Sequence, residues 1–182
     1  MPLIIRHLTK LSNRMISSRS LPNPQTLQRM ASRYPELDIP SVEVCLAFLD
    51  TTTAFYEAID GYLADHGLSR GKFTLLMQLV EADEDGLLPS EFAERAGVTR
   101  ATVTTLLDGL EREQLVRRQP HPVDRRMLRV HMTEKGRDLI TGILPDHFCR
   151  TKRLMAQLSD RDKKTLIKLL AKLRSGIPAL QD

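Results

Sequence analysis

The chain has 182 residues, enough to bury a proper core as one domain or as one domain with an extension. Its hydrophobic fraction of 41% and charged fraction of 27% are ordinary for a soluble globular protein, and no apolar run approaches the roughly 18 residues that span a bilayer. A formal charge of +4 permits a nucleic-acid partner without establishing one. Residues 1–40 carry six Lys+Arg and two Asp+Glu, whereas residues 41–182 carry 21 of each, so any basic surface in the main body is local.

Residues 1–40 are predicted to form a basic N-terminal extension. Residues 1–20 contain no acid, and their arginines and serines vaguely resemble a transit peptide. A helix is expected near residues 24–34, with Asn23 as its cap and Pro24 in its first turn. The side chains expected on one side of this helix are Leu27, Met30 and Tyr34.

Two helices are predicted before the central motif. The first covers residues 41–66, between Pro40 and Gly67, and its two apolar stripes indicate two neighbours. The second starts after Ser69, which caps it, and a solvated loop over residues 82–86 follows. The positions of the second helix that are predicted to face inward are Phe73, Leu76, Met77 and Val80.

Residues 88–114 have the pattern of two short helices joined by a tight turn. Gly97 can take the positive φ that ends the first helix, and the Thr99 hydroxyl can cap the second. The apolar residues of the second helix recur at i, i+3, i+4 and i+7 and define a buried face: Val103, Leu106, Leu107 and Leu110. The opposite face, which is left to meet a partner, holds Ala101, Thr104, Thr105, Asp108 and Arg112, with Arg100 and Thr102 at its flanks.

An arginine-rich β-hairpin is predicted directly after this pair of helices. Residues 115–118 and 128–132 alternate apolar and polar side chains, and residues 120–124 supply turn formers. Residues 114–132 contain five arginines against the single acid Asp124. Guanidinium groups match phosphate geometry, and a narrow ribbon can enter a nucleic-acid groove. An isolated basic hairpin would more often be a solvated surface, but the two helices before it favour the nucleic-acid interpretation.

Two more helices are predicted at the C-terminal end. A helix from residue 133 to about 158 should be kinked or split at Pro145. Ser159 and Asp162 resemble a capping box that opens the last helix. The side chains that the first of these helices is expected to bury are Leu139, Ile140, Ile143, Leu144, Phe148, Leu154 and Met155. The apolar face of the last helix, which should join the N-terminal helices in a dimer interface, holds Leu166, Ile167, Leu169, Leu170 and Leu173.

Taken together, residues 88–133 resemble the winged helix-turn-helix of the MarR family of bacterial transcription regulators. Asp124-Arg125-Arg126 resembles the family's Asp-x-Arg wing signature, and residues 132–136, Met-Thr-Glu-Lys-Gly, resemble its Leu-Thr-x-x-Gly entry into the next helix. The resemblance implies that Arg126 reaches the minor groove and that Asp124 orients it. It also favours a bacterial N-terminal extension over a transit peptide.

The resemblance implies a mostly α fold with a small β-hairpin wing, in which the winged helix-turn-helix is flanked by N- and C-terminal dimerisation helices. Residues 41–182 would form a single MarR-like domain, with dimerisation helices at 41–67 and 133–176 and the winged lobe at 69–132. We expect a sequence-specific transcriptional regulator, with repression favoured over activation. As a homodimer it would bind a pseudo-palindromic operator in double-stranded DNA. A small-molecule effector would release it; its site does not follow from the sequence, and the crevice between the long helices and the winged lobe is the natural place for it. The residues expected to contact DNA are Arg100, Thr102, Thr104 and Thr105 on the second helix and Arg117, Asp124, Arg125 and Arg126 on the wing.

A thiol-based redox-sensing regulator that uses Cys45 is the alternative. Cys45 is placed like the peroxide-sensing cysteine of the organic-hydroperoxide regulators in this family, but Leu49, Ile59 and Arg70 stand where the assisting tyrosines would be. A small apolar core residue is the competing interpretation of Cys45, since a buried thiol is inert unless its pKa is lowered. The urate-responsive branch shares the extra N-terminal helix, but Phe73-Thr74 and Leu106 replace its urate ligands.

The remaining classes of function find little support in the sequence. No acid/base or nucleophile constellation and no phosphate-binding glycine loop occurs, so neither an enzyme nor a cofactor is expected. Asp146, His147 and Cys149 are close in sequence but diverge on a helix, so no metal site is expected. The two cysteines provide no disulfide framework, which indicates a reducing cytoplasm, and no membrane partner is expected. A winged helix that binds protein instead of DNA stays open.

Overall fold

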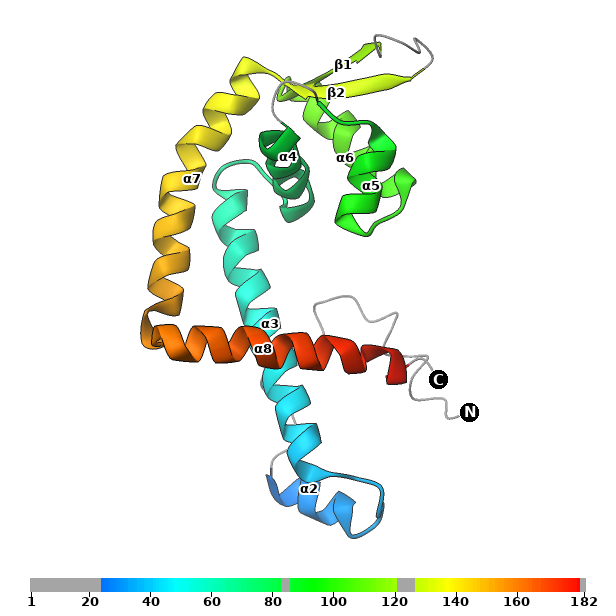
Figure 1. Ribbon diagram of the computed structural model, residues 1–182, viewed down its shortest axis with the longest axis vertical. Coiled ribbons are helices and arrows are strands. Elements are labelled where there is room, and N and C mark those ends of the chain that lie inside the picture. Colours follow the sequence, from blue (N-terminus) through cyan, green and yellow to red (C-terminus); the bar gives the residue numbers. More distant parts are fainter. Residues whose placement is uncertain (1–23, 83–85, 121–126, 181–182) are drawn as a thin grey trace. The chain divides into compact units, whose positions relative to one another are not determined.

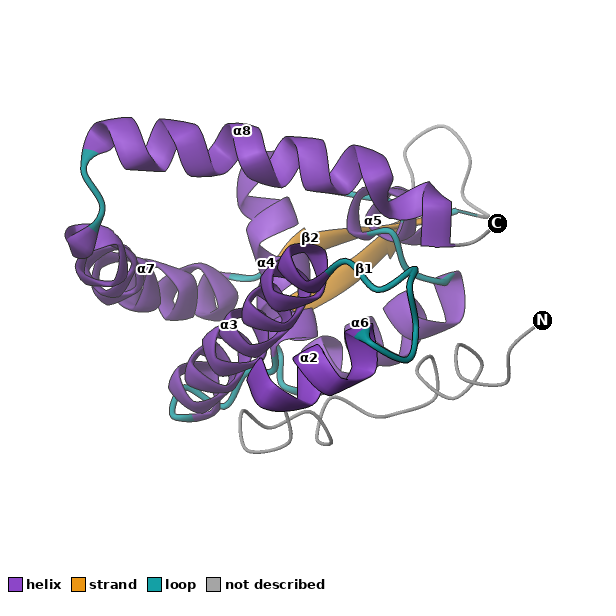
Figure 2. Cartoon of the chain, turned by 90° about the horizontal axis from the view of Figure 1, so that it is seen from below, coloured by secondary structure: helices purple, strands orange, loops and turns teal. Residues whose placement is uncertain are grey.

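The computed structural model describes residues 24–82, 86–120 and 127–180. Within these ranges the chain forms seven α-helices, two short 3₁₀ helices and one two-stranded antiparallel hairpin (Figure 1, Figure 2). The predicted fold class, mostly α with a small β-hairpin, is confirmed. The chain divides into two compact units, Met1–Phe73 and Thr74–Asp182, and each is described by itself.

The first unit contains α2 (Pro24–Ala31) and α3 (Ile39–Ala64). Helix α2 begins at Pro24 as predicted but ends three residues earlier than expected. Pro35 explains the early end, because a residue before proline disfavours helical dihedral angles. Among the three side chains predicted to share one side of α2, Leu27 is buried, whereas Met30 and Tyr34 are exposed.

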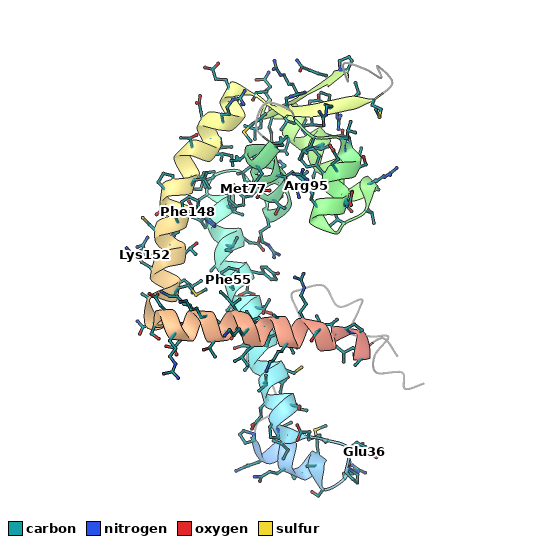
Figure 3. The ribbon with its side chains drawn as sticks, viewed as in Figure 1. Glu36, Phe55, Met77, Arg95, Phe148 and Lys152 are labelled. Carbon is teal, nitrogen blue, oxygen red and sulfur yellow. The ribbon has the colours of Figure 1, made fainter. Side chains whose placement is uncertain are left out.

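Helix α3 starts at Ile39, two residues before the predicted start. Its cap is Asp38, whose carboxylate accepts a hydrogen bond from the Ser41 N–H at 3.0 Å. Pro40 lies inside the first turn, where its missing N–H costs no helical hydrogen bond. Large apolar side chains such as Phe55, which projects from α3, are exposed along much of the helix (Figure 3). The two predicted apolar stripes are therefore mostly exposed, although Tyr62 and Leu63 near the end of α3 are buried.

Helix α4 (Arg70–Ala82) begins in the first unit and continues into the second, and the Ser69 hydroxyl caps it by accepting from the Lys72 N–H. The prediction that Val80 faces inward is wrong, since 44% of Val80 is exposed. Apolar side chains lie on most sides of α4, so their spacing in the sequence does not determine which side is buried. The buried residues are Leu75, Leu76, Gln78 and Leu79.

The central part of the second unit contains α5 (Pro89–Ala96), α6 (Arg100–Arg112), β1 (Val116–Pro120) and β2 (Leu128–Met132). The hairpin contacts α5 through β2 and α6 through β1 (Figure 1). Its register pairs Val116 with Met132 and Pro120 with Leu128, so Pro120 ends a strand and does not belong to the turn. The other predicted turn residues, 121–124, lie outside the described residues. The core of this part is formed by fully buried side chains from α5, α6 and β2: Phe92, Val103, Leu107, Leu110 and Val130.

The second unit ends with α7 (Glu134–Leu154), a 3₁₀ turn η3 (Met155–Gln157), α8 (Asp160–Gly176) and a 3₁₀ turn η4 (Ile177–Leu180). Helix α7 runs through Pro145 without being split, contrary to one predicted outcome. Ile140 and Ile143 are buried as expected, but 60% of Phe148, which projects from α7, is exposed (Figure 3). Leu154 is exposed as well.

Helix α8 opens with the predicted capping box between Ser159 and Asp162. None of its residues is buried, and its apolar face is open. In the part of the chain that the structure describes, no helix combines the length and the apolar composition needed to cross a membrane.

Candidate nucleic-acid interface

The turn between α5 and α6 sets the direction of the exposed helix. Gly97 has φ +64°, in the left-handed region, and the Val98 N–H closes the end of α5 by donating to the Ala93 carbonyl oxygen at 3.1 Å. The Thr99 hydroxyl then accepts from the Thr102 N–H and starts α6. Both roles predicted for this turn are confirmed.

Helix α6 is anchored by one apolar face, which fixes what the other face presents. Val103, Leu107 and Leu110 are fully buried, and Leu106 is half-buried. The residues of the opposite face, predicted to meet a partner, are all exposed: Arg100, Ala101, Thr102, Thr104, Thr105, Asp108 and Arg112.

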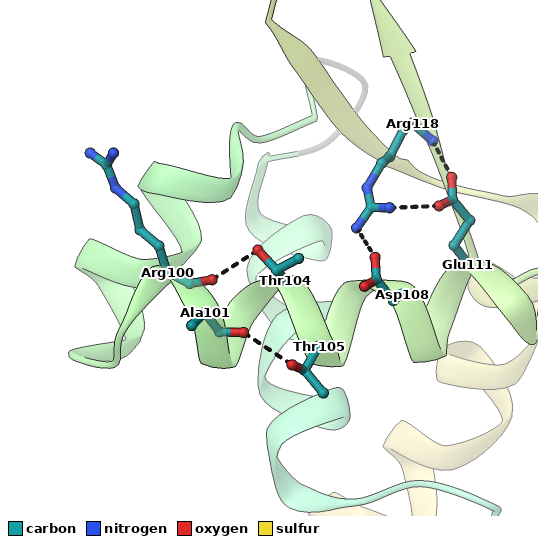
Figure 4. Close-up of polar contacts among 7 residues, drawn as sticks. All are labelled: Arg100, Ala101, Thr104, Thr105, Asp108, Glu111 and Arg118. Carbon is teal, nitrogen blue, oxygen red and sulfur yellow. Dashed lines mark hydrogen bonds and ion pairs between the residues drawn. The ribbon is translucent and has the colours of Figure 1, made fainter.

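The threonines of this exposed face are already engaged through their hydroxyl hydrogens. Thr104 donates to the Arg100 carbonyl oxygen at 3.0 Å, and Thr105 donates to the Ala101 carbonyl oxygen at 3.1 Å (Figure 4). Their oxygens can still accept from base amino groups, and their methyl groups can contact thymine methyls. Arg100, the first residue of α6, extends away from the helix and has no side-chain partner among the described residues (Figure 4).

The arginines of the hairpin fall into two kinds. Arg117 is exposed on β1 and has no partner among the described residues. Arg118 is half-buried and is bound by Glu111 and Asp108 of α6. Arg129 Nη2 lies 3.7 Å from the Glu91 carboxylate of α5. From the sequence all five hairpin arginines were counted together, but Arg118 and Arg129 are paired with acids of α5 and α6. Of these acids only Asp108 was named from the sequence, as part of the face left to meet a partner.

Three predicted wing residues, Asp124, Arg125 and Arg126, lie outside the described residues. The structure describes Gln119 and Pro120 on one side of them and Met127 and Leu128 on the other. Pro120 and Leu128 form the last described pair of the hairpin ladder.

The first turn of α7 holds the C-terminal end of α6. Lys135 Nζ donates to the Glu113 carbonyl oxygen at 2.9 Å, and Thr133 Oγ1 donates to the Gln114 carbonyl oxygen at 2.7 Å. Thr133 also accepts from the Gly136 N–H and so caps α7. Carbonyl groups at a helix end have no partner within the helix, so these donors stabilise the end of α6 and join it to α7.

A small cavity of about 230 Å³ lies in the second unit, between α4, the end of β2 and α7. Most of its walls are apolar, and Arg137 provides a cationic group that has no partner among the described residues. The lining residues are Leu79, Val80, Met132, Arg137, Ile140, Thr141 and Leu144.

Cys45 is exposed on α3 and Cys149 is exposed on α7, and both are free thiols. The interpretation of Cys45 as an apolar core residue is therefore wrong for the isolated chain. Arg70, which stands where an assisting tyrosine was sought, is bound to Asp60 at 2.6 Å and lies over the Tyr56 ring. Among the described residues, no three His, Cys, Asp or Glu side chains are grouped as metal ligands would be.

The turn, the buried face of α6 and the hairpin that follows define a winged helix-turn-helix protein. The sequence model of the MarR family matches residues 66–127. The chain is 34% identical to the HTH-type transcriptional repressor YetL of Bacillus subtilis, over 90% of this chain and 98% of that protein. It is 25% identical to the transcriptional repressor MprA of Escherichia coli, over 91% and 94% of the two chains. The chain belongs to the MarR family of transcriptional regulators.

Solved structures agree on the fold. A MarR family transcriptional regulator from Streptomyces coelicolor, solved in complex with DNA, has a TM-score of 0.71 at 22% identity and covers 77% of this chain and 89% of its own. The MepR–DNA complex of S. aureus has a TM-score of 0.65 at 22% identity, over 73% and 95% of the two chains. At this level of identity the likeness concerns the fold alone.

Proposed function

We propose that the protein is a sequence-specific DNA-binding repressor of transcription. The observation that carries this proposal is the exposed face of α6, where Arg100 has no side-chain partner within the described part of the chain and stands beside threonines whose oxygens can still accept. The relatives named as repressors and the neighbours solved with DNA support it. In a bacterial cell such a regulator acts in the cytoplasm, where the DNA is.

In this proposal α6 enters the major groove. Arg100 binds phosphate or guanine, while Thr102, Thr104 and Thr105 contact base edges or the adjacent backbone. On the wing, Arg117 and Arg125 bind phosphates, and Arg126, oriented by Asp124, reaches the minor groove, as the family resemblance implies. The wing contacts add affinity that depends on salt, because each phosphate contact releases counterions.

We also propose that the protein acts as a homodimer. The large apolar surface exposed on α3 and α8 favours association with another chain. A second copy of this chain is the simplest partner, because identical chains are always present together. Residues 41–67 and 133–176 would supply the dimerisation helices, and residues 69–132 the winged lobe. Two lobes would bind half-sites about 10 bp apart in a pseudo-palindrome. The exposed apolar residues that support this are Val44, Phe48, Leu49 and Phe55 on α3 and Leu166, Ile167, Leu169, Leu170 and Leu173 on α8.

A small-molecule effector would release the operator. The cavity beside α7 supports a small anionic ligand with an apolar body, because its walls are apolar and Arg137 offers a cation. Helix α7 also carries Thr133 and Lys135, which hold the end of α6. A ligand that displaces the start of α7 would therefore displace the proposed DNA-reading helix. Redox sensing through Cys45 gains no support, since exposure alone does not make a thiol reactive.

Fluorescence anisotropy with the DNA flanking the protein's own gene tests the proposed interface. Arg100→Ala and Arg126→Ala should each weaken operator binding by about tenfold or more while the dimer stays folded. Arg174→Ala, an exposed arginine of α8, is the matched control and should leave affinity unchanged. Unchanged affinity in both Arg100→Ala and Arg126→Ala would remove this face and the wing from the mechanism.

A further inference from the structure

Arg118 is bound more extensively than any other described arginine of the hairpin. Its Nη1 donates to Glu111 Oε2 at 2.9 Å, its Nη2 donates to Asp108 Oδ1 at 2.6 Å, and its backbone N–H donates to Glu111 Oε1 at 3.1 Å (Figure 4). Only 24% of its side chain is exposed. A guanidinium held at two points by carboxylates has few donors left for phosphate.

The two acids that bind Arg118 lie on the helix proposed to read DNA. Asp108 belongs to the same exposed face as Thr104 and Thr105, and 57% of its side chain is exposed. An unpaired carboxylate on that face would repel the phosphates of a bound duplex. The guanidinium of Arg118 offsets this repulsion, because it lies against both carboxylates.

The same contacts join the hairpin to α6. Glu111 accepts from both the backbone and the side chain of Arg118, so the position of β1 on α6 is fixed at two points. Strand β2 follows β1 through the antiparallel ladder. Arg117, the preceding residue, points to the other face of the strand and is exposed.

We propose that Arg118 is a positioning residue of the DNA-binding surface and not a DNA contact: it fixes the wing on α6 and neutralises Asp108 and Glu111. This inference rests on the proposed function, since it assumes that α6 and the wing bind one duplex. Arg117 and Arg118 are adjacent arginines that would then act by different means. Arg117 acts on phosphate directly, and Arg118 acts through the two acids.

A double-mutant cycle on operator affinity, measured over a range of salt concentrations with the full chain, tests this. Arg118→Gln is compared in the unsubstituted background and in Asp108→Asn/Glu111→Gln, and Arg117→Gln is the matched control in both. Urea unfolding of each variant separates loss of fold from loss of affinity. Arg118→Gln should weaken binding about tenfold in the unsubstituted background and less than about threefold where the acids are absent, because coupled residues are not additive.

Arg117→Gln should instead cost the same in both backgrounds and lower the slope of log affinity against log salt by about 0.9. Equal costs of Arg118→Gln in the two backgrounds, with the same loss of slope, would overturn the inference and make Arg118 a phosphate contact. If Arg118→Gln fails to fold, Arg118→Lys keeps the charge but not the two-carboxylate geometry, and it should still lose affinity. Full affinity of Arg118→Lys would contradict the inference. Absence of any salt-dependent binding by the unsubstituted protein would overturn the proposed function and this inference with it.

Discussion

Gly136, in the first turn of α7, lies so close to the carbonyl oxygen of Leu115 that no β-carbon fits between them. That carbonyl accepts from the Thr133 N–H at 3.1 Å, and the Met132 side chain closes the other side of the same space. The end of α6, the start of β1 and the start of α7 therefore meet at one glycine.

Gly136→Ala should destabilise the second unit, because the methyl group collides with backbone that cannot move without breaking the Thr133 contact. We expect a loss of about 1–3 kcal/mol in the free energy of unfolding, as for other overpacked sites, measured by urea denaturation.

Gly142→Ala is the matched control in the same helix. A β-carbon at Gly142 meets nothing within 4 Å, and alanine favours helix over glycine. This variant should be as stable as the unsubstituted protein or up to about 1 kcal/mol more stable. Equal changes in the free energy of unfolding for the two substitutions would show that the close approach at Gly136 does not affect stability.

Leu170→Asp on the apolar face of α8 should dissociate the proposed homodimer, because burying an unpaired carboxylate in an apolar interface is costly. Sedimentation velocity at a fixed protein concentration measures this. Ser175→Asp adds the same charge to an exposed position on the other side of α8 and should leave the dimer intact. A dimer that survives Leu170→Asp would place the interface elsewhere.

The cap of α8 should make that helix sensitive to acid. Hydrogen bonds from the Ser159 hydroxyl, and to a smaller extent from the Ser159 backbone N–H, hold the pKa of the Asp162 carboxyl below its ordinary value. A carboxyl group whose pKa is lowered on folding stabilises the fold above its unfolded pKa, and this contribution is lost as pH falls through the folded pKa. An NMR titration should therefore place the pKa of Asp162 below that of an unperturbed aspartate. In Ser159→Ala the midpoint should rise, and an unchanged midpoint would exclude the capping contact as its cause.

Benzoate, a small anion with an apolar ring, is a suitable probe of the cavity beside α7. It should bind the unsubstituted protein and weaken operator binding. Arg137→Gln should reduce both effects, because Arg137 supplies the cationic group among the described residues of the lining. Isothermal titration calorimetry and anisotropy measure the two effects. Arg174→Gln, away from the cavity lining, is the control, and equal benzoate affinity in both variants would exclude Arg137 as the anion partner.

The sequence predicted the parts of this fold that depend on local pattern. The buried face of α6 follows from the spacing of Val103, Leu107 and Leu110, and the turn follows from the conformational freedom of Gly97. The prediction that Val80 is buried was wrong. Because α4 has apolar side chains on most sides, the elements packed against it determine which side is buried.

The pairing of the hairpin arginines could not be predicted from spacing. Arg118 meets acids that are seven and ten residues earlier in the chain, and only the docking of β1 on α6 brings them together. A count of charges in the hairpin therefore overstated the basic surface that is free to meet DNA. The acids in the C-terminal half of the proposed recognition helix were the available signal, since a carboxylate on a DNA-binding face repels phosphate unless it is neutralised or accepts from a base.

The binding of the purified protein to the DNA flanking its own gene, titrated against salt and mapped by footprinting, tests the central claim most directly. We expect steep salt-dependent binding to one short pseudo-palindrome with half-sites about 10 bp apart, unchanged by mild peroxide. Loss of binding in peroxide that Cys45→Ser prevents would instead favour redox sensing. No binding at any salt concentration, or equal binding to every sequence, would contradict the assignment of α6 and the wing as a sequence-specific DNA interface.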